Sequence, residues 1–456
     1  MNLAHLIALD PTSPQADYFV RACGAKRFVW NLAHEEWERQ FAAASAAAKA
    51  ARESLPAKTK KSVVKRAIKK AVEAIGGWPS AAWLKADFNS WKYEVYPWLK
   101  EIHRDAHSQP FADLQDAYSR FRAKTAEKPK FKKKGKAKDS FYVANDKFEL
   151  DGSKIRLPNV GEVRMAESLR FTGKIMSATV SRRADRWFVS ISVETDDPRP
   201  TKLKKNGQPR RSAQPLPATK RCSVSGLDFG ILHAVVTSAG VVYDAPKPLK
   251  EALKKLARLQ RGQARRLEAQ KAGGRKERSQ AWRDANKQIA RLHARIANIR
   301  KDFIHKMTTD LCRENQALVI EDLNVKGMMQ NHCLARALSD VGLGEIRRQL
   351  TYKAEIYGTE LVVASRWFAS TKKCSRCGVV GPKLPLSQRT FKCASCGFEC
   401  DRDLNASLNL EHELTYPRLE GNQRLRTERK GSLSAHDGEQ PSLEEAGTKR
   451  ALVRNG

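Results

Sequence analysis

The chain of 456 residues is too long for one ordinary domain, and its 85 Lys and Arg outnumber 50 Asp and Glu to give a formal net charge of +35. A surplus this large exceeds what solubility requires and indicates a polyanionic partner, most simply nucleic acid. No apolar run approaches the roughly 20 residues of a membrane span, and the first residues do not have the pattern of a signal peptide. We therefore expect a cytoplasmic protein of two or three domains with no membrane partner.

The N-terminal part is predicted to be one strand followed by helices. Residues 3–10 can form the strand, and apolar residues then recur at helical spacing over about 13–70. A second helical block is expected over 80–124, with breaks near Pro97 and Pro110. This block is rich in aromatic residues. We expect most of them in the core, while a few that lie among Lys and Arg could stack on unpaired bases.

Short segments with alternating apolar and polar residues follow the basic stretch 128–136. Turn residues separate them, which is the pattern of a small β-barrel. The predicted strands are 141–144, 148–150, 154–157, 162–165, 178–182 and 187–193. A polar stretch rich in Pro and Lys, 196–221, then marks a domain boundary.

From residue 223 onward the pattern predicts an α/β domain. The predicted strands are 223–228, 234–238, 241–244, 317–321 and 360–365, and the predicted helices are 248–271, 275–314, 337–357 and 403–414. The tail beyond about residue 415 is polar and low in aromatic residues, so we expect it to be disordered.

Four of the nine cysteines form two CxxC pairs. They are Cys374, Cys377, Cys393 and Cys396. Thiolates bind Zn²⁺ tetrahedrally, and two such pairs separated by about 15 residues are typical of a closed structural site. The remaining cysteines show no framework. The sequence therefore predicts one structural Zn²⁺ and a reducing compartment rather than disulfides.

Three acidic residues stand where strands end or a helix begins. Asp228 follows an apolar strand and is set between two glycines, Glu321 ends a four-residue apolar run, and Asp403 starts the last helix. A buried carboxylate is costly unless a cation compensates it. Two Mg²⁺ ions would do so, and they would activate water and stabilise the leaving 3′-oxygen in phosphodiester hydrolysis.

The three acids together predict a metal-dependent nuclease of the RNase H/RuvC type, with Asp228, Glu321 and Asp403 as ligands of two catalytic Mg²⁺ ions. Each acid taken alone is more often a helix cap or a turn former. Asp401 is the alternative third ligand. We favour Asp403 and expect Asp401 to cap the helix or to support the ligands from behind.

These motifs resemble the TnpB (OrfB) proteins of bacterial insertion sequences. The segments that carry the resemblance are 226–230 (GLDFG), 318–323 (LVIEDL), 370–378 (STKKCSRCG), 393–397 (CASCG) and 401–409 (DRDLNASLN), with 23–31 (CGAKRFVWN), 129–135 (PKFKKKG) and 155–158 (IRLP) before them. Together they cover most of residues 1–412.

The resemblance implies an RNA-guided DNA endonuclease of the bacterial cytoplasm, related to the compact type V CRISPR effectors. Its partners would be a guide RNA and a double-stranded DNA target with a short adjacent motif, and we do not expect a protein oligomer. The implied domains are a wedge β-barrel (1–12 and 125–198), a helical recognition domain (13–124), a linker (199–221), a RuvC-like nuclease domain (222–369 and 401–414), a zinc ribbon (370–400) and a disordered tail (415–456).

Two alternatives remain open from the sequence. One is an RNA-guided DNA-binding regulator that does not cleave, although all three candidate positions are acidic here. The other is a transposase that uses the same two-metal chemistry for strand transfer. The sequence also leaves open whether the guide derives from a transposon end or from a CRISPR array.

Overall fold

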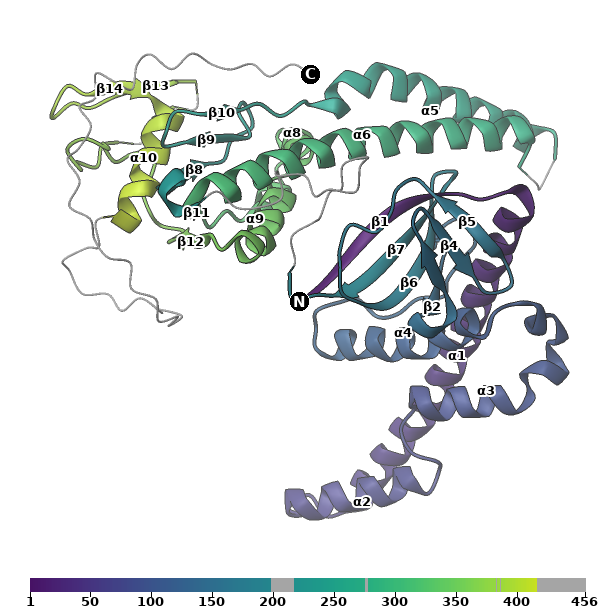
Figure 1. The fold of residues 1–456 in the computed structure, drawn as a ribbon. Coiled ribbons are helices and arrows are strands. Elements are labelled where there is room, and N and C mark those ends of the chain that lie inside the picture. Colours follow the sequence, from purple (N-terminus) through teal and green to yellow (C-terminus); the bar gives the residue numbers. More distant parts are fainter. Residues whose placement is uncertain (198–216, 275–277, 383, 386, 416–456) are drawn as a thin grey trace. The chain divides into compact units, whose positions relative to one another are not determined.

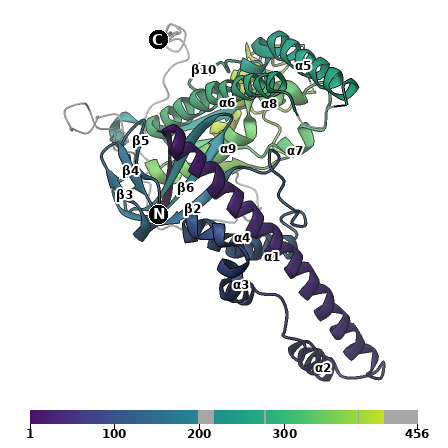
Figure 2. The same cartoon turned by 90° about the vertical axis from the view of Figure 1, so that its right-hand side faces the viewer.

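The computed structural model describes residues 1–197, 217–274, 278–382, 384–385 and 387–415 (Figures 1 and 2). The chain divides into two compact units, one of residues 1–213 with 286–294 and one of residues 214–285 with 295–456. Most of the predicted linker and nearly all of the predicted disordered tail lie outside the described residues. None of the helices in the described ranges is both long and apolar enough to cross a bilayer.

The first unit is built on a seven-stranded sheet in the order β2-β6-β7-β1-β5-β4-β3 (Figure 1). The strands are β1 (Asn2–Asp10), β2 (Ser140–Ala144), β3 (Glu149–Asp151), β4 (Lys154–Leu157), β5 (Gly161–Met165), β6 (Lys174–Arg183) and β7 (Arg186–Glu194). Each predicted short strand is present, and β1 pairs antiparallel with both β5 and β7. In this order β2 and β3 are the edges, so the closed barrel remains a prediction.

The segment between β1 and β2 is mainly helical. They are α1 (Ser13–Glu53), α2 (Lys61–Glu73), α3 (Ala81–Val95), the 3₁₀ turn η1 (Pro97–Glu101) and α4 (Arg104–Arg122). Helix α1 packs on the sheet through Phe19, which is fully buried and whose ring lies 5.6 Å from that of Phe141 and 5.1 Å from that of Trp187. The predicted helical run over 13–70 is thus two helices, with Pro56 in the connection.

The predicted break at Pro97 is confirmed, whereas the predicted break at Pro110 is wrong. Pro97 begins η1, but Pro110 lies inside α4. A proline in a helix forfeits one backbone hydrogen bond. Helix α4 continues because its buried face, including Phe111 and Leu114, packs into the core of the unit.

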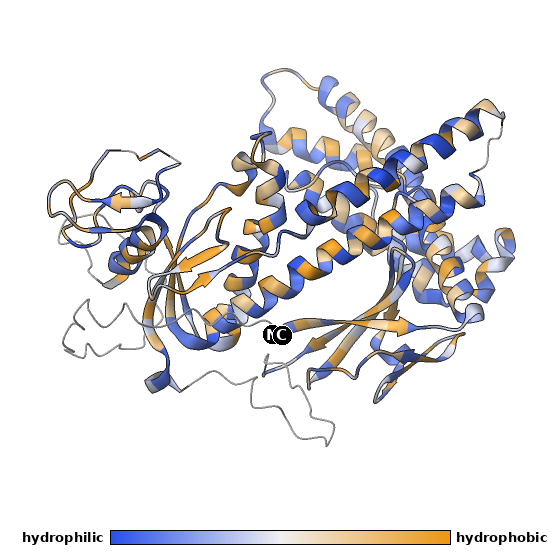
Figure 3. Ribbon diagram, turned by 90° about the horizontal axis from the view of Figure 1, so that it is seen from above, coloured by the Kyte–Doolittle hydropathy of each residue, from blue (hydrophilic) through white to orange (hydrophobic). Residues whose placement is uncertain are grey.

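The second unit contains a five-stranded sheet in the order β10-β9-β8-β11-β12. The strands are β8 (Cys222–Asp228), β9 (Val235–Thr237), β10 (Val242–Tyr243), β11 (Asn315–Glu321) and β12 (Glu360–Ala364). Strand β11 is parallel to both β8 and β12, while β9 is antiparallel to β8 and β10. Hydrophobic residues gather along the strands in Figure 3. The run of apolar residues in β11 is what a strand buried on both faces requires.

Helices cover both faces of this sheet. They are α5 (Pro248–Ala272), α6 (Gln280–Glu314), α7 (Val325–Met328), α8 (Ala335–Val341), α9 (Leu343–Tyr357) and α10 (Arg402–Thr415). Leu318 and Ile320 of β11 join one core cluster with residues of α6, α8 and α9, whereas Val319 joins a second cluster with Leu410 of α10. Successive residues of β11 therefore pack into two separate hydrophobic cores, one on each face of the sheet.

The prediction of one continuous helix over 337–357 is wrong, because the structure has two helices there, α8 and α9. Gly342 has a φ of +79° and ends α8, and α9 begins at the next residue. A left-handed residue cannot lie inside an α-helix, and glycine adopts this conformation without steric cost. The apolar periodicity that predicted one helix continues across the break.

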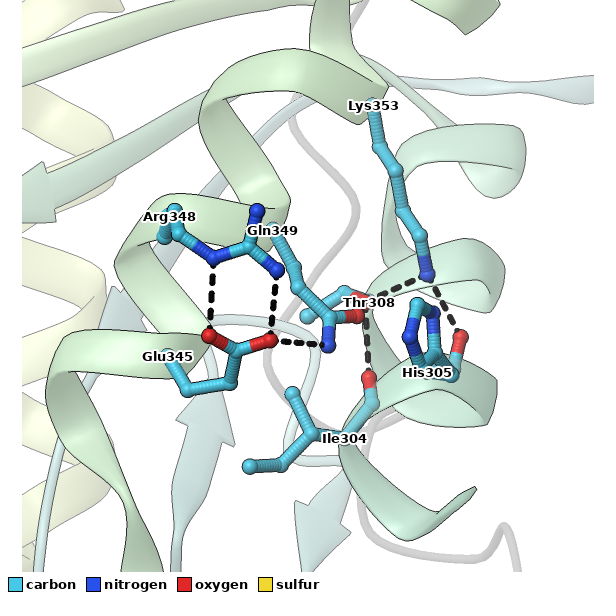
Figure 4. A network of polar contacts seen from close by, with 7 residues as sticks. All are labelled: Ile304, His305, Thr308, Glu345, Arg348, Gln349 and Lys353. Atoms are coloured by element: carbon cyan, nitrogen blue, oxygen red, sulfur yellow. Dashed lines mark hydrogen bonds and ion pairs between the residues drawn. The ribbon is translucent and has the colours of Figure 1, made fainter. Parts of the chain in front are cut away.

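A buried lysine joins α9 to α6 (Figure 4). Lys353 is 5% exposed, and its Nζ donates hydrogen bonds of 2.7 Å to the carbonyl of His305 and to the hydroxyls of Thr308 and Thr309. Burial lowers the pKa of Lys353 to about 8. All three acceptors are neutral, so α9 is held on α6 by a cation for which the described part of the chain supplies no hydrogen-bonded carboxylate.

Candidate functional site

The two CxxC pairs bring four sulfur atoms together. The Sγ atoms of Cys374 and Cys396 lie 3.7 Å apart, those of Cys377 and Cys393 lie 3.5 Å apart, and all four fall within 4.8 Å of one another. Tetrahedral zinc with Zn–S bonds of about 2.3 Å requires sulfur atoms about 3.8 Å apart. The donor set and its spacing therefore fit a closed structural zinc site.

Matching backbone turns hold the two pairs. The N–H of Cys374 donates to the carbonyl of Val379 (2.9 Å), and the N–H of Cys393 donates to the carbonyl of Phe398 (2.8 Å). The backbone N–H of Cys396 is the main reason why the pKa of the Cys393 thiol falls to about 6. In the same cluster the pKa of Cys374 is raised, chiefly by burial, and that of Cys377 is raised to about 12, so the thiols do not lose their protons equally in the absence of a metal.

Two buried asparagines tie the first pair to α10. The amide of Asn405 donates to the carbonyl of Lys373 (2.8 Å) and accepts from the N–H of Ser375 (3.0 Å). Asn409 donates to the carbonyls of Ser370 (2.7 Å) and Lys373 (2.6 Å). Both asparagines are fully buried. This role was not predicted from the sequence, although a spacing of four residues places the two asparagines on one face of a helix.

Asp228 and Glu321 lie at the same edge of the sheet. Strands β8 and β11 run parallel, with Leu227 opposite Ile320, and each of the two acids is the next residue and the last of its strand. The carboxyl ends of parallel strands meet at one edge. The fold therefore brings together two acids that are far apart in the sequence.

Helix α10 brings Asp403 to the same edge. The helix crosses β8 at Gly226, where an added Cβ would lie 1.9 Å from the carbonyl oxygen of Ser407 and 2.6 Å from the backbone nitrogen of Glu411. Only glycine permits this approach. Asp403 is in the first turn of α10, and its charge, like that of Glu321, acts on Asp228.

Asp228 is the most perturbed of these acids. It is 8% exposed, and no hydrogen bond or ion pair to its carboxylate is found among the described residues. Burial raises its pKa well above 3.8, and the charges of Glu321 and Asp403 raise it further, against a smaller opposing effect of Arg402. This is the environment of a carboxylate that a cation would stabilise.

The neighbouring groups differ among the three acids. Glu321 accepts a hydrogen bond from the hydroxyl of Ser370, which is 3% exposed. Asp403 lies 3.7 Å from the guanidinium of Arg389. Asp401 accepts bonds from the N–H groups of Asp403 (2.9 Å) and Leu404 (3.1 Å), which confirms its predicted role as a helix cap.

The carboxylates are not gathered as tightly as the sulfur atoms. Within the described ranges, the four cysteines are the one group of three or more His, Cys, Asp or Glu whose atoms lie close enough to hold a metal ion. The carboxylate oxygens of Asp228, Glu321 and Asp403 therefore do not form a group as tight as that of the sulfur atoms. Their role as ligands of two Mg²⁺ ions is taken up below as a proposal.

Three family profiles match the chain. They are described as "Helix-turn-helix domain" (residues 1–45), "Probable transposase" (190–332) and "Cas12f1-like, TNB domain" (344–410). The last one covers the cysteine pairs and the first turns of α10. The first covers β1 and part of a single long helix, α1, so the structure does not show two helices joined by a turn in that range.

Curated relatives extend the match to most of the chain. A "Putative RNA-guided DNA endonuclease" of Streptomyces pristinaespiralis is 37% identical over 330 residues, which are 71% of this chain and 75% of that protein. The Escherichia coli protein "Putative RNA-guided DNA endonuclease InsQ" is 30% identical over 328 residues, or 69% and 75% of the two chains. Among solved structures, a Cas12f1–sgRNA–target DNA complex aligns with 90% of this chain and 99% of that one at 13% identity. Its TM-score of 0.28 is too low to establish a common fold.

The motifs quoted above, the family profiles and the identity to relatives over three quarters of their length agree with one another. The chain belongs to the TnpB (OrfB) family.

Proposed function

We propose that the protein is an RNA-guided DNA endonuclease that hydrolyses phosphodiester bonds at Asp228, Glu321 and Asp403. The observation that carries the proposal is Asp228, a buried carboxylate for which the described residues supply no hydrogen-bonded partner, and whose pKa is raised by burial and by the charges of Glu321 and Asp403 at the same sheet edge. Such an arrangement destabilises the folded protein unless it binds cations. The names of the curated relatives support the same activity.

The three carboxylates would hold two Mg²⁺ ions, which when bound would activate water and stabilise the leaving oxygen. The chain's own residues have separate tasks. The hydroxyl of Ser370 orients Glu321 by donating a hydrogen bond to its carboxylate. Asp401 caps the first turn of α10, so that Asp403 keeps its position. The RuvC-like domain is likewise a proposal, which the strand order β10-β9-β8-β11-β12 and the packing of α10 support.

We further propose that the basic surface binds a guide RNA and the DNA target, and that the domain boundaries follow those expected from the sequence. The net charge of +35 supports a polyanionic partner. Sequencing the RNA that purifies with the protein tests this part. One defined species that ends in a variable segment supports a guide, and a heterogeneous mixture of cellular RNA contradicts it.

The test of the carboxylates is a comparison of Asp228→Asn and Glu321→Gln with the wild type in Mg²⁺. We expect cleavage to fall by at least about 10³-fold, because several kcal/mol of transition-state stabilisation are lost. RNA-dependent DNA binding should stay near normal. Asp228→Asn should also melt at the same or a higher temperature than the metal-free wild type, because the substitution removes a repelled buried charge.

Asp302→Asn is the matched control, because Asp302 is exposed and pairs with Lys306 on α6. It should cleave like the wild type. A wild-type protein that binds guided DNA without cutting it would instead support the regulator, and strand-transfer products would support the transposase. Wild-type cleavage rates in Asp228→Asn would contradict the site.

A further inference from the structure

Trp367 is the most exposed large hydrophobic side chain in the described part of the chain, at 89%. No ring or cation contact to its indole is found within those residues. An indole in water forgoes the favourable transfer of a large apolar surface. Because tryptophan offers the largest π-face of any side chain, such exposure is what a stacking surface requires.

The segment that carries Trp367 is fixed at both ends to the carboxylate edge. Just before Trp367, the guanidinium of Arg366 lies 2.6 Å from the carboxylate of Asp322, the residue after Glu321. Three residues after it, the hydroxyl of Ser370 donates a hydrogen bond to the carboxylate of Glu321 itself. The tryptophan is therefore held on a short loop whose two anchors are consecutive residues of the β11 edge.

This placement puts the indole close to the candidate site. Ala364, at the end of β12, pairs in register with Glu321. Trp367 lies three residues beyond Ala364 and three before Ser370, so its Cα is at most about 11 Å from the Cα of either. A base within a few nucleotides of a phosphate at the carboxylates can reach the indole.

The charge of the segment fits a nucleic acid. Residues 366–376 carry four cationic side chains and no acidic one. Among them, Lys373 extends its Nζ over the ring of Phe368 at 5.7 Å. Arg366 already pairs with Asp322. A protein partner that covered an apolar side chain here would have to bury or pair the other three cations, whereas a phosphate backbone would neutralise them.

We propose that Trp367 is a stacking platform for an unpaired base of the DNA strand whose phosphate lies at the carboxylate edge. The inference rests on the proposed function for the identity of that edge. The base must be unpaired and unstacked, because the neighbours of a base inside a duplex cover both of its faces. The platform binds without regard to sequence, since every base has a π-face.

Photocrosslinking tests the contact without requiring cleavage. The probe is a ten-nucleotide single-stranded DNA in which one thymine at a time is replaced by 5-bromouracil, irradiated with the full-length RNA-bound protein in Ca²⁺. Trypsin cleaves after Arg366 and after Lys372, so residues 367–372 form one tryptic peptide and mass spectrometry can assign the adduct to it. We expect it on this peptide at one or two probe positions, and at least a tenfold loss in Trp367→Leu.

Matched variants separate stacking from other effects. Trp78→Leu removes a tryptophan that is 50% exposed in the first unit and should leave the 367–372 adduct unchanged. Trp367→Phe keeps a flat ring and should cleave single strands within a few-fold of the wild type. Trp367→Leu should bind single-stranded DNA at the carboxylate edge roughly 5- to 150-fold more weakly than the wild type and cleave it with a higher KM.

The results separate the platform from the proposed function. An adduct on 367–372 in a protein that cuts no DNA in Mg²⁺ would support the platform and contradict the nuclease. No adduct on this peptide, or equal yields from single-stranded and duplex probes, would overturn the platform even if the protein cleaves DNA. A protein rather than DNA crosslinked at this peptide in the cell would also overturn it.

Discussion

Gly226→Ala should separate folding from catalysis, because it acts on the contact between β8 and α10. The new Cβ would lie 1.9 Å from the carbonyl oxygen of Ser407 and 2.6 Å from the backbone nitrogen of Glu411, whereas real Cβ atoms essentially never approach closer than 3.0 Å. Both atoms belong to the backbone, so no side chain can rotate away. Helix α10 must retreat from the strand by roughly 1 Å.

The size of the effect follows from what α10 carries. Overpacking of this kind costs typically 1–3 kcal/mol of stability, which a folded domain can tolerate. The same shift moves Asp403 with respect to Asp228, and a displacement of about 1 Å at a reacting centre can cost about 10²-fold in rate. We therefore expect a folded protein that binds DNA with its guide RNA but cleaves about 10²-fold more slowly. Single-turnover cleavage in saturating Mg²⁺, with thermal unfolding beside it, measures both effects.

Gly344→Ala is the control, since Gly344 lies in α9 of the same unit and its nearest neighbour for a new Cβ is a side-chain atom of Val325 at 3.9 Å. It should keep the wild-type rate. If Gly226→Ala cleaves like Gly344→Ala, the position of α10 does not govern the rate. If Gly226→Ala unfolds, the expectation that the folded domain tolerates the clash is wrong.

Three shorter predictions concern the four-cysteine zinc site, the orientation of Glu321 and the buried Lys353. Cys393→Ser should lower the melting temperature and the zinc content together, because a structural site couples metal to folding; an unchanged zinc stoichiometry would contradict the four-cysteine assignment. Ser370→Ala should slow cleavage about tenfold with unchanged DNA binding, and Ser370→Thr should restore it; equal rates in all three proteins would remove Ser370 from the mechanism. Burial lowers the pKa of Lys353 to about 8 in the folded protein, against 10.5 for an ordinary lysine, so the unfolded chain binds more protons between these pH values. The free energy of unfolding of the wild type should therefore rise relative to Lys353→Met by up to about 3 kcal/mol from pH 8 to 10.5, as denaturant titrations would measure, and a parallel course of the two proteins would refute the low pKa.

Local patterns in the sequence predicted local structure well. Alternating residues predicted the short strands of the first unit, and the CxxC spacing predicted a cluster that the sulfur distances of 3.5 and 3.7 Å bear out. Each signal is a pattern of residues that are only two or three positions apart in the chain, within one strand or within one CxxC pair. Local signals failed where packing or one backbone angle decided the outcome, as at Pro110, which α4 accommodates, and at Gly342, which interrupts a continuous apolar pattern.

The candidate site was predictable as a set of residue types but not as a constellation. Asp228, Glu321 and Asp403 stood out because each is a charge next to an apolar run or a helix start. Their common edge depends on the parallel pairing of β8 with β11 and on the crossing of α10, which are long-range contacts. Ser370 stands in the segment 370–378 that carries the resemblance, but its bond to Glu321 could not be predicted, because it exists only in the folded chain.

The order of the carboxylates along the chain bears on when the protein can become active during its synthesis. Asp403 follows Asp228 by 175 residues, and the cysteine pairs lie between Glu321 and Asp403. At translation rates of about 5–20 residues per second, roughly 9 to 35 seconds separate the first acid from the third. For the last 82 residues of this interval, from Glu321 to Asp403 or roughly 4 to 16 seconds, the nascent chain holds β8 and β11 without the helix that covers Val319 and supplies the last acid. A product that terminates before residue 403 would therefore expose an uncovered sheet face and lack the complete set of acids. Under the proposed function, the basic chain could then gather nucleic acid before its site for cleavage is complete.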